Sequence, residues 1–187
     1  KISEIPYRID GLINLEKLDL SNNFIKYLGG LTYATDNSQY LYKLKNLKEL
    51  NLEENKIDCI SIDIENLINL EKLNLSCNKI KNLPDTICNL KNLKELKCYE
   101  NIIKEFPANI EKLESLEILD LSYNAIEYIP KSIGKLKNLK KLNLQGNIIK
   151  EIPEEIGELE NLEELNLSDN KIEYLPDSIG KLKNLTK

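Results

Sequence analysis

The four cysteines of this 187-residue chain are its most reactive side chains, because thiolates bind metals, attack carbonyls and form disulfides. They lie at Cys59, Cys77, Cys88 and Cys98. No two have the Cys-x-x-Cys spacing that is typical of zinc sites and redox disulfides. We expect Cys98 to point into a core and Cys77 to point outward, so neither a disulfide between them nor a four-cysteine metal site is predicted. Free thiols favour a reducing, intracellular (cytoplasmic) location.

Acid–base and phosphate chemistry are no better supported. Glu154 and Glu155 are adjacent carboxylates, but we expect them on a solvated segment where nothing raises a pKa. The chain has no histidine, which excludes serine–histidine and cysteine–histidine catalysis and imidazole metal ligation. It has no phosphate-binding glycine loop or zinc-protease motif. We therefore predict no enzymatic activity and no cofactor.

Charge and hydropathy exclude two classes of partner. The net charge is −5 and the pI is near 5.1, so the chain lacks the basic footprint of a nucleic-acid-binding protein. It contains no apolar run long enough to span a bilayer, so no membrane insertion is expected. Its 41% hydrophobic residues suffice for a folded core.

One sequence unit, LxxLxLxxNxIxxLPxxIxxLxx, repeats along the whole chain. Its first leucines are Leu15, Leu47, Leu70, Leu93, Leu116, Leu139, Leu162 and Leu185. From Leu47 onward each interval is 23 residues, whereas the first interval carries nine more. All six prolines of the chain occupy one column of the repeat once this insertion is allowed for. Each unit is therefore one structural element of a stacked array.

The unit itself predicts its local structure. Leu142 and Leu144 flank Asn143 with period two, which predicts a short strand. Pro153 then opens a segment with acidic residues behind it, which is typical of a first helical position. Gly157 and its equivalents are expected to stop this short helix or 3₁₀ turn. No unit can bury its apolar face alone, so neighbouring units must stack.

An unbroken column of asparagines follows the strands. Its members are Asn23, Asn55, Asn78, Asn101, Asn124, Asn147 and Asn170. A polar side chain at the edge of a core needs partners, and an amide can both donate to and accept from neighbouring backbone groups. We therefore predict a hydrogen-bond ladder between repeats.

With these motifs the chain resembles leucine-rich repeat proteins of the 23-residue class, similar to intracellular Ras-pathway scaffolds, plant intracellular repeat proteins and bacterial ones. It departs from that pattern at Gly29 and Ser61, where proline is expected, and at Cys98, where a strand leucine is expected. The resemblance implies an α/β solenoid: a curved horseshoe with a concave parallel β-sheet and short helical or 3₁₀ segments on the convex side.

The same pattern predicts a single domain over 1–187. Residues 1–14 match a partial repeat, and 15–46 form a repeat with an insertion at 29–40. Six 23-residue repeats occupy 47–184, and 185–187 begin a further one. The insertion is either a tolerated loop or a second contact site, the latter favoured by Tyr33, Tyr40 and Tyr42.

In this family partners usually occupy the concave sheet, so the outward columns there are the candidate binding surface. Three such columns contain six acidic residues and one lysine: Asp19, Glu53, Glu54, Glu100, Asp120, Asp169 and Lys97. This balance disfavours DNA and RNA and favours a protein partner with a neutral or basic surface. The sequence does not predict an oligomeric state.

A second pattern locates the contact. The residue after each first leucine alternates in charge along the array, beginning Glu16, Lys48, Glu71, and the adjoining column alternates until Ile118 interrupts it. Polar columns also give way to apolar residues in the fourth to sixth full repeats. The predicted partner-binding residues are Tyr99, Tyr123, Ile118, Lys97, Glu100, Ile102 and Ile148. Exposed aromatic clusters of this kind are typical interface hot spots.

These observations predict a non-catalytic protein–protein interaction module or scaffold. The alternative is the recognition arm of a larger enzyme, such as a kinase, a GTPase, a ubiquitin ligase or a cyclase, whose catalytic domain lies outside this chain. The sequences that flank the chain would separate the two.

Overall fold

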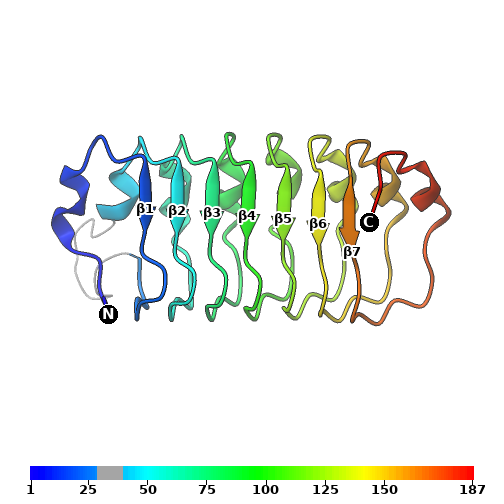
Figure 1. The fold of residues 1–187 in the computed structure, drawn as a ribbon, viewed down its shortest axis with the longest axis horizontal. Coiled ribbons are helices and arrows are strands. Elements are labelled where there is room, and N and C mark those ends of the chain that lie inside the picture. The colour runs from blue at the N-terminus through cyan, green and yellow to red at the C-terminus, as the bar shows by residue number, and fades with distance from the viewer. Residues whose placement is uncertain (29–39) are drawn as a thin grey trace.

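The computed structural model describes residues 1–28 and 40–187 of the chain. Within them, seven strands form one parallel sheet whose order follows the chain (Figure 1). The strands are β1 (Lys17–Asp19), β2 (Glu49–Asn51), β3 (Lys72–Asn74), β4 (Glu95–Lys97), β5 (Ile118–Asp120), β6 (Lys141–Asn143) and β7 (Glu164–Asn166). Equivalent residues pair in register, for example Leu50 with Leu73 and Leu73 with Leu96.

Each strand turns its central leucine inward and displays two side chains, and this leucine is buried in β2–β6 and partly buried in β1 and β7. In β6, Leu142 is 1% exposed, whereas Lys141 and Asn143 face outward. The sequence predicted the strand around Leu142, Asn143 and Leu144, and the observed strand begins one residue earlier. Leu144 directly follows it and is fully buried, so the alternation of inward and outward side chains continues past the last strand residue.

Short 3₁₀ segments lie behind the sheet, one for each repeat (Figure 1). They are η1 (Tyr7–Gly11), η2 (Tyr40–Lys43), η3 (Ile62–Asn66), η4 (Asp85–Asn89), η5 (Ile110–Lys112), η6 (Lys131–Lys135), η7 (Glu154–Glu158) and η8 (Asp177–Lys181). The repeat proline lies one residue earlier than expected, because Pro153 is the extended N-cap of η7. In η3 that place is taken by Ser61, whose side chain accepts a hydrogen bond from the Asp63 amide at 3.2 Å.

The expectation that glycines stop these segments was wrong. Gly134 and Gly157 lie inside η6 and η7, and both are buried. A Cβ on Gly134 would lie 2.4 Å from the carbonyl oxygen of Glu155, and one on Gly157 would lie 2.4 Å from that of Ser178. The glycines therefore allow neighbouring segments on the convex side to approach closely, and they have no stop function.

The predicted asparagine ladder is present. Asn78 donates from Nδ2 to the carbonyl oxygens of Leu75 and Ser76 in its own repeat and to that of Leu52 in the preceding one. Its Oδ1 accepts from the amide of Ile57 at 2.9 Å. The same pattern recurs at Asn101, which is 9% exposed. Each asparagine thus links two repeats through backbone groups that would otherwise be buried without partners.

A second polar column, which sequence reasoning missed, holds the opposite edge of the array. Its amide Nδ2 groups donate to a carbonyl oxygen of the preceding repeat, as Asn69 does to Lys45 and Asn92 to Ile68. Ser115 occupies the place once and donates from its hydroxyl to Lys91. The signal was visible as the asparagine directly before most first leucines.

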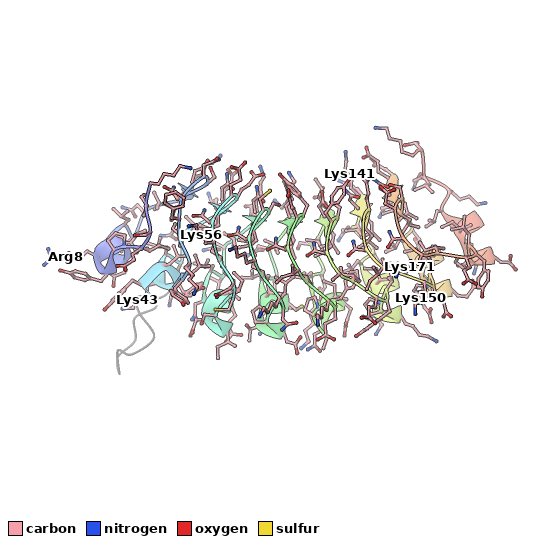
Figure 2. All side chains as sticks on the ribbon, turned by 90° about the horizontal axis from the view of Figure 1, so that it is seen from below. Arg8, Lys43, Lys56, Lys141, Lys150 and Lys171 are labelled. Atoms are coloured by element: carbon pink, nitrogen blue, oxygen red, sulfur yellow. The ribbon has the colours of Figure 1, made fainter. Side chains whose placement is uncertain are left out.

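The array bows gently, with the sheet on its inner side and the 3₁₀ segments on its outer side (Figure 2). The insertion predicted at 29–40 lies outside the described residues except for Tyr40. Tyr40 begins η2, and its ring packs edge-on against Tyr7 with a centroid distance of 6.1 Å. Tyr42, one of the tyrosines that favoured a second contact site, is 2% exposed and belongs to the core. It cannot contribute to such a surface.

Candidate partner-binding surface

The inner face of the sheet displays two side chains per strand, the first and third residue of each. Thirteen of these fourteen positions carry lysine, glutamate, aspartate or asparagine. The single apolar one is Ile118, the first residue of β5, which is half-buried. The first residues of the strands comprise three lysines and three glutamates besides Ile118, so they leave the acidic balance predicted for this face unchanged.

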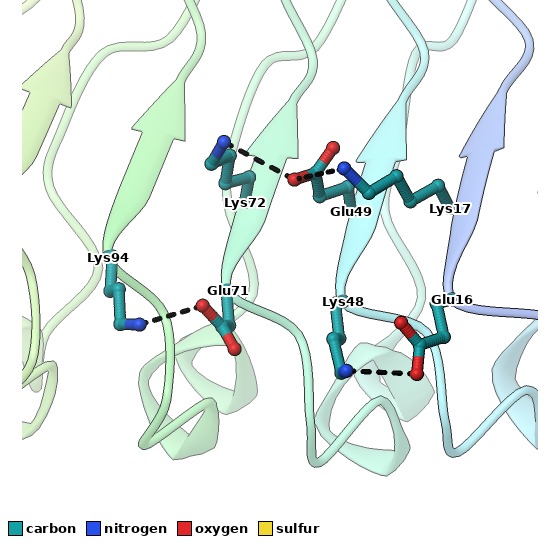
Figure 3. A network of polar contacts seen from close by, with 7 residues as sticks. All are labelled: Glu16, Lys17, Lys48, Glu49, Glu71, Lys72 and Lys94. Atoms are coloured by element: carbon teal, nitrogen blue, oxygen red, sulfur yellow. Dashed lines mark hydrogen bonds and ion pairs between the residues drawn. The ribbon is translucent and has the colours of Figure 1, made fainter.

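The polar positions form ion pairs between neighbouring strands. Glu49 of β2 lies between two lysines, with its carboxylate 3.1 Å from Lys17 and 3.3 Å from Lys72 (Figure 3). The two lysines lower the pKa of Glu49. One residue upstream, Lys48 pairs with Glu16 at 2.9 Å and Lys94 pairs with Glu71 at 2.7 Å (Figure 3). The predicted charge alternation therefore forms discrete pairs and two triads, the second made by Lys141, Glu164 and Lys187. All are accessible to solvent, where such pairs are weak.

Ile118 interrupts this arrangement at β5. The alternating pattern would place a lysine beside Glu95 there, and the register shows Glu95 paired with Ile118 instead. Glu95 instead forms an ion pair with Lys97 on its own strand. The pairs resume beyond the interruption, where Lys141 lies 2.9 Å from Glu164. Because Ile118 has no charge to offer Glu95, the carboxylate of Glu95 pairs with Lys97 of the same strand.

Two shallow hollows lie side by side on this face, and Lys97 lines both. The first has a volume of about 370 Å³ and lies over β1–β4, lined by paired charges such as Lys17, Glu49 and Lys72. The second has a volume of about 560 Å³ and lies over β4–β7. Its outward side chains include Ile118, Asp120, Lys141 and Asn143. Of the seven predicted contact residues, Lys97 and Ile118 line this larger hollow.

The chain leaves each strand through a turn with one residue in the left-handed region. This residue is Asn22, Glu54, Cys77, Glu100, Tyr123, Gly146 or Asp169, with φ between 51° and 67°. Glycine, asparagine and aspartate tolerate that region, whereas an aromatic residue there is strained. Tyr123 is 51% exposed, and its ring leans over Gly146, where a Cβ would lie 2.7 Å from the tyrosine Cδ1.

The Tyr99 ring points the other way along the array. Its hydroxyl donates to Glu53 Oε1 at 2.8 Å, two repeats toward the N-terminus, and the side chain is half-buried. Hydrogen bonds with Cys77 and Glu53 raise the pKa of Tyr99 well above its usual range. The single aromatic patch expected from Tyr99 and Tyr123 is therefore divided into two places.

The remaining predicted residues lie around these two places. Glu100 is exposed at the turn after β4 and accepts a hydrogen bond from Cys77 Sγ at 3.4 Å. Ile102 is 47% exposed and Ile148 is half-buried, both just after the ladder asparagines. Figure 2 shows the edge of the array that carries this column, where Lys56 and Lys171 occupy the equivalent positions in other repeats.

Cys98 and Cys77 lie where the repeat pattern placed them. Cys98 is fully buried in the core, Cys77 is on the inner face, and all four cysteines are free. Burial raises the pKa of the Cys88 thiol to about 12, with Asp85 and Glu111 adding to the effect. In the described residues no group of three or more cysteine or acidic side chains is arranged to hold a metal ion. None of the described helices has the length and apolar character to cross a bilayer.

Comparison with known families agrees with this geometry. The model of the leucine-rich repeat region family matches residues 27–125 and 118–187, and the leucine-rich repeat model matches 14–33. The chain belongs to the leucine-rich repeat family. Members of this family generally serve as interaction modules without catalytic activity.

Solved leucine-rich repeat structures superpose closely on the chain. A leucine-rich repeat protein of Leptospira interrogans has a TM-score of 0.87 and 39% identity, over 96% of this chain and 44% of that one. An internalin of Listeria monocytogenes has a TM-score of 0.84 and 27% identity, over 100% and 50%. The ectodomain of the plant receptor kinase GASSHO1 from Arabidopsis thaliana, solved in complex with Casparian strip integrity factor 2, has a TM-score of 0.80 and 30% identity, over 98% and 25%.

Curated relatives are much longer than the chain. A probable serine/threonine-protein kinase, pats1 of Dictyostelium discoideum, is 43% identical over 70 residues, which is 37% of this chain and 2% of that protein. The human volume-regulated anion channel subunit LRRC8A is 39% identical over 83 residues, which is 44% of this chain and 9% of that protein.

Proposed function

We propose that this leucine-rich repeat chain is a non-catalytic module that binds a protein partner on the inner face of its sheet, over the fourth to sixth full repeats. One observation carries the proposal. Ile118 is the single apolar side chain among the fourteen outward strand positions, and it lines the larger of the two hollows. An apolar anchor surrounded by polar groups is the usual composition of an interface centre.

The surrounding residues support the same location. Tyr123 and Ile102 are about half exposed in the segments that follow β5 and β4, and Lys97 lines both hollows. Glu100 and Ile148 complete the predicted contact. The acidic balance of the face favours a partner whose contacting surface is neutral or basic. The four free thiols favour an intracellular site of action.

A photo-crosslinking amino acid tests the surface directly. Placed at Tyr123, it should crosslink a protein partner in lysate from the source cells, and excess unlabelled chain should compete. Placed at Lys131, an exposed position on η6 of the convex side, it should give no competed product. The double variant Ile118→Ser, Tyr123→Ala should abolish co-purification of the crosslinked partner. Crosslinks from Lys131 alone would contradict the proposal.

A second candidate function is the recognition arm of a larger enzyme. The similarity to the kinase pats1, of which the matched region is only 2%, favours it. The same inner face would then select the substrate or regulator of an attached catalytic domain. The coding sequence on either side of this chain decides between the two functions.

A further inference from the structure

Within the described residues the strand glutamates pair with lysines, whereas the strand aspartates and the glutamates of the following turns do not. Glu49, Glu71 and Glu164 each pair with at least one lysine. The turn residues Glu53 and Glu100, in contrast, accept hydrogen bonds from neutral donors. In the described part of the chain, neither forms an ion pair. Negative charge without a lysine partner therefore gathers at the carboxyl ends of β2–β4.

The rim lysine that follows β2 is engaged elsewhere. Lys56 follows Glu54 by two residues, and its ammonium lies 4.5 Å from the centroid of the Phe24 ring. Lys97 is committed to Glu95 within its own strand. Glu54 is itself exposed at the turn after β2 and adds to the acidic surface.

A hydrogen bond between two side chains spans the turns that follow β2–β4. Glu53, Ser76 and Tyr99 occupy equivalent positions after β2, β3 and β4, so they stand in a row across the face. The bond from the Tyr99 hydroxyl to Glu53, 2.8 Å long, passes over the middle member. Ser76 is fully buried although its position in the repeat faces outward. We call this bond the Tyr99–Glu53 bridge.

The buried hydroxyl beneath the bridge lacks a partner. Ser122 and Ser168, at the same position of later repeats, donate from Oγ to the strand residue two positions earlier, at 2.6 and 2.7 Å. Ser76 Oγ has no hydrogen-bond partner within the described structure. A buried hydroxyl without a partner is less stable than one with a hydrogen bond, so a donor supplied from outside would be stabilising.

We propose that the Tyr99–Glu53 bridge covers a pocket that receives a lysine or arginine side chain of the protein partner. When the Tyr99 ring swings aside, the entering cation donates to the carboxylate of Glu53 and to Ser76 Oγ. Glu100 adds charge at the rim, and the face of the tyrosine ring covers the cation. This inference rests on the proposed function, because it assigns a second contact on the same face.

The position of the pocket predicts a pattern in the partner. The pocket is centred two residues beyond the end of β3, whereas Ile118 is the first residue of β5. Two strand spacings, roughly 10 Å, and four residues along the strand direction, roughly 13 Å, separate them, or roughly 16 Å in all. An extended segment advances about 3.3 Å per residue. A partner segment that crosses the face obliquely between these two sites therefore presents a basic and an apolar residue about five positions apart.

Titration with amino-acid derivatives tests the pocket without the partner. N-acetyl-lysine methylamide and N-acetyl-arginine methylamide should shift the ring resonances of Tyr99 in a saturable manner, whereas the uncharged N-acetyl-norleucine methylamide should not. Glu53→Gln should weaken the effect about fivefold or more, since it removes the charge that binds the cation. Asp169→Asn, which removes an acid from the turn column of Glu100, three repeats beyond it, should leave it unchanged.

A further variant separates the pocket from general attraction to acidic surface. Tyr99→Phe removes the competing hydroxyl and should tighten binding of the lysine derivative about two- to fivefold, followed through the amide resonance of Ser76. Equal shifts with the norleucine derivative, or the same affinity in Glu53→Gln, would overturn the proposal. Neither result depends on crosslinking at Tyr123, so failure of the pocket and failure of the proposed function are distinguishable.

Discussion

The hollow over β1–β4 and the hollow over β4–β7 are built from equivalent strands, with the same register and the same inward leucines. The outward side chains that line them differ. Over β1–β4, lysines and glutamates pair across strands and cover the sheet with satisfied charge. Over β4–β7, one isoleucine replaces a lysine of that pattern. The repeat therefore determines the frame, and single outward substitutions determine where a partner can displace water at low cost.

The largest expected effect comes from breaking the frame that both hollows share. Asn101 follows β4 and joins the third and fourth full repeats through its amide. Asn101→Ala leaves the Ile80 amide and several carbonyl oxygens buried without partners, so we expect a loss of about 3 kcal/mol in the free energy of unfolding.

Urea unfolding followed by circular dichroism measures this loss. Because each repeat contacts only its neighbours, the variant should also unfold in two steps, one for each side of β4. Asn82→Ala, at an exposed loop position, is the matched control and should change stability by less than about 0.5 kcal/mol. A single transition with unchanged midpoint for Asn101→Ala would show that the ladder does not hold the two regions together.

An intermediate effect is expected from making the two hollows alike. Ile118→Lys places a lysine beside Glu95 and releases Lys97 from it, with Lys141 as its like-charged neighbour on β6. The side chain is half-buried on an outward position, so stability should change by less than about 0.5 kcal/mol, while partner affinity falls about tenfold or more. Isothermal titration with the crosslinked partner measures the affinity, and Asn51→Lys in the other hollow serves as control. Equal losses in both variants would contradict a contact centred on β5.

The smallest effect concerns the ion pairs themselves. Lysine neighbours lower the pKa of Glu49 and Glu71, with Glu49 flanked on both sides. A carboxyl whose pKa is lower in the folded state stabilises the fold above its unfolded value near 4.5 and loses that contribution as the pH falls through the lowered pKa. Carboxyl resonances followed from pH 7 downward should show Glu49 titrating below an unpaired glutamate peptide. A midpoint at the unfolded value would show that these pairs are absent in solution.

The repeat made most of the frame predictable, because inward leucines and ladder asparagines recur at fixed intervals. Cys98 is buried and Cys77 faces outward, as the alternation of strand positions required. The role of Gly157 was misread, since a glycine needed for close approach and one needed to end a helix look the same in sequence. The orientation of Tyr99 could not be predicted, because its rotamer depends on a carboxylate that lies 46 residues away.

The two asparagine columns also determine how the molecule would respond to a pulling force. The bonds that they make between repeats join each repeat to the one directly before it, as those of Asn78 and Asn92 do at opposite edges. Tension applied to the two chain ends would therefore load these contacts in series. Repeats should detach from an end one at a time, and each would release about 75 Å of chain, given an extended length near 3.3 Å per residue. The same construction that presents a broad binding face would thus also make the array an extensible tether.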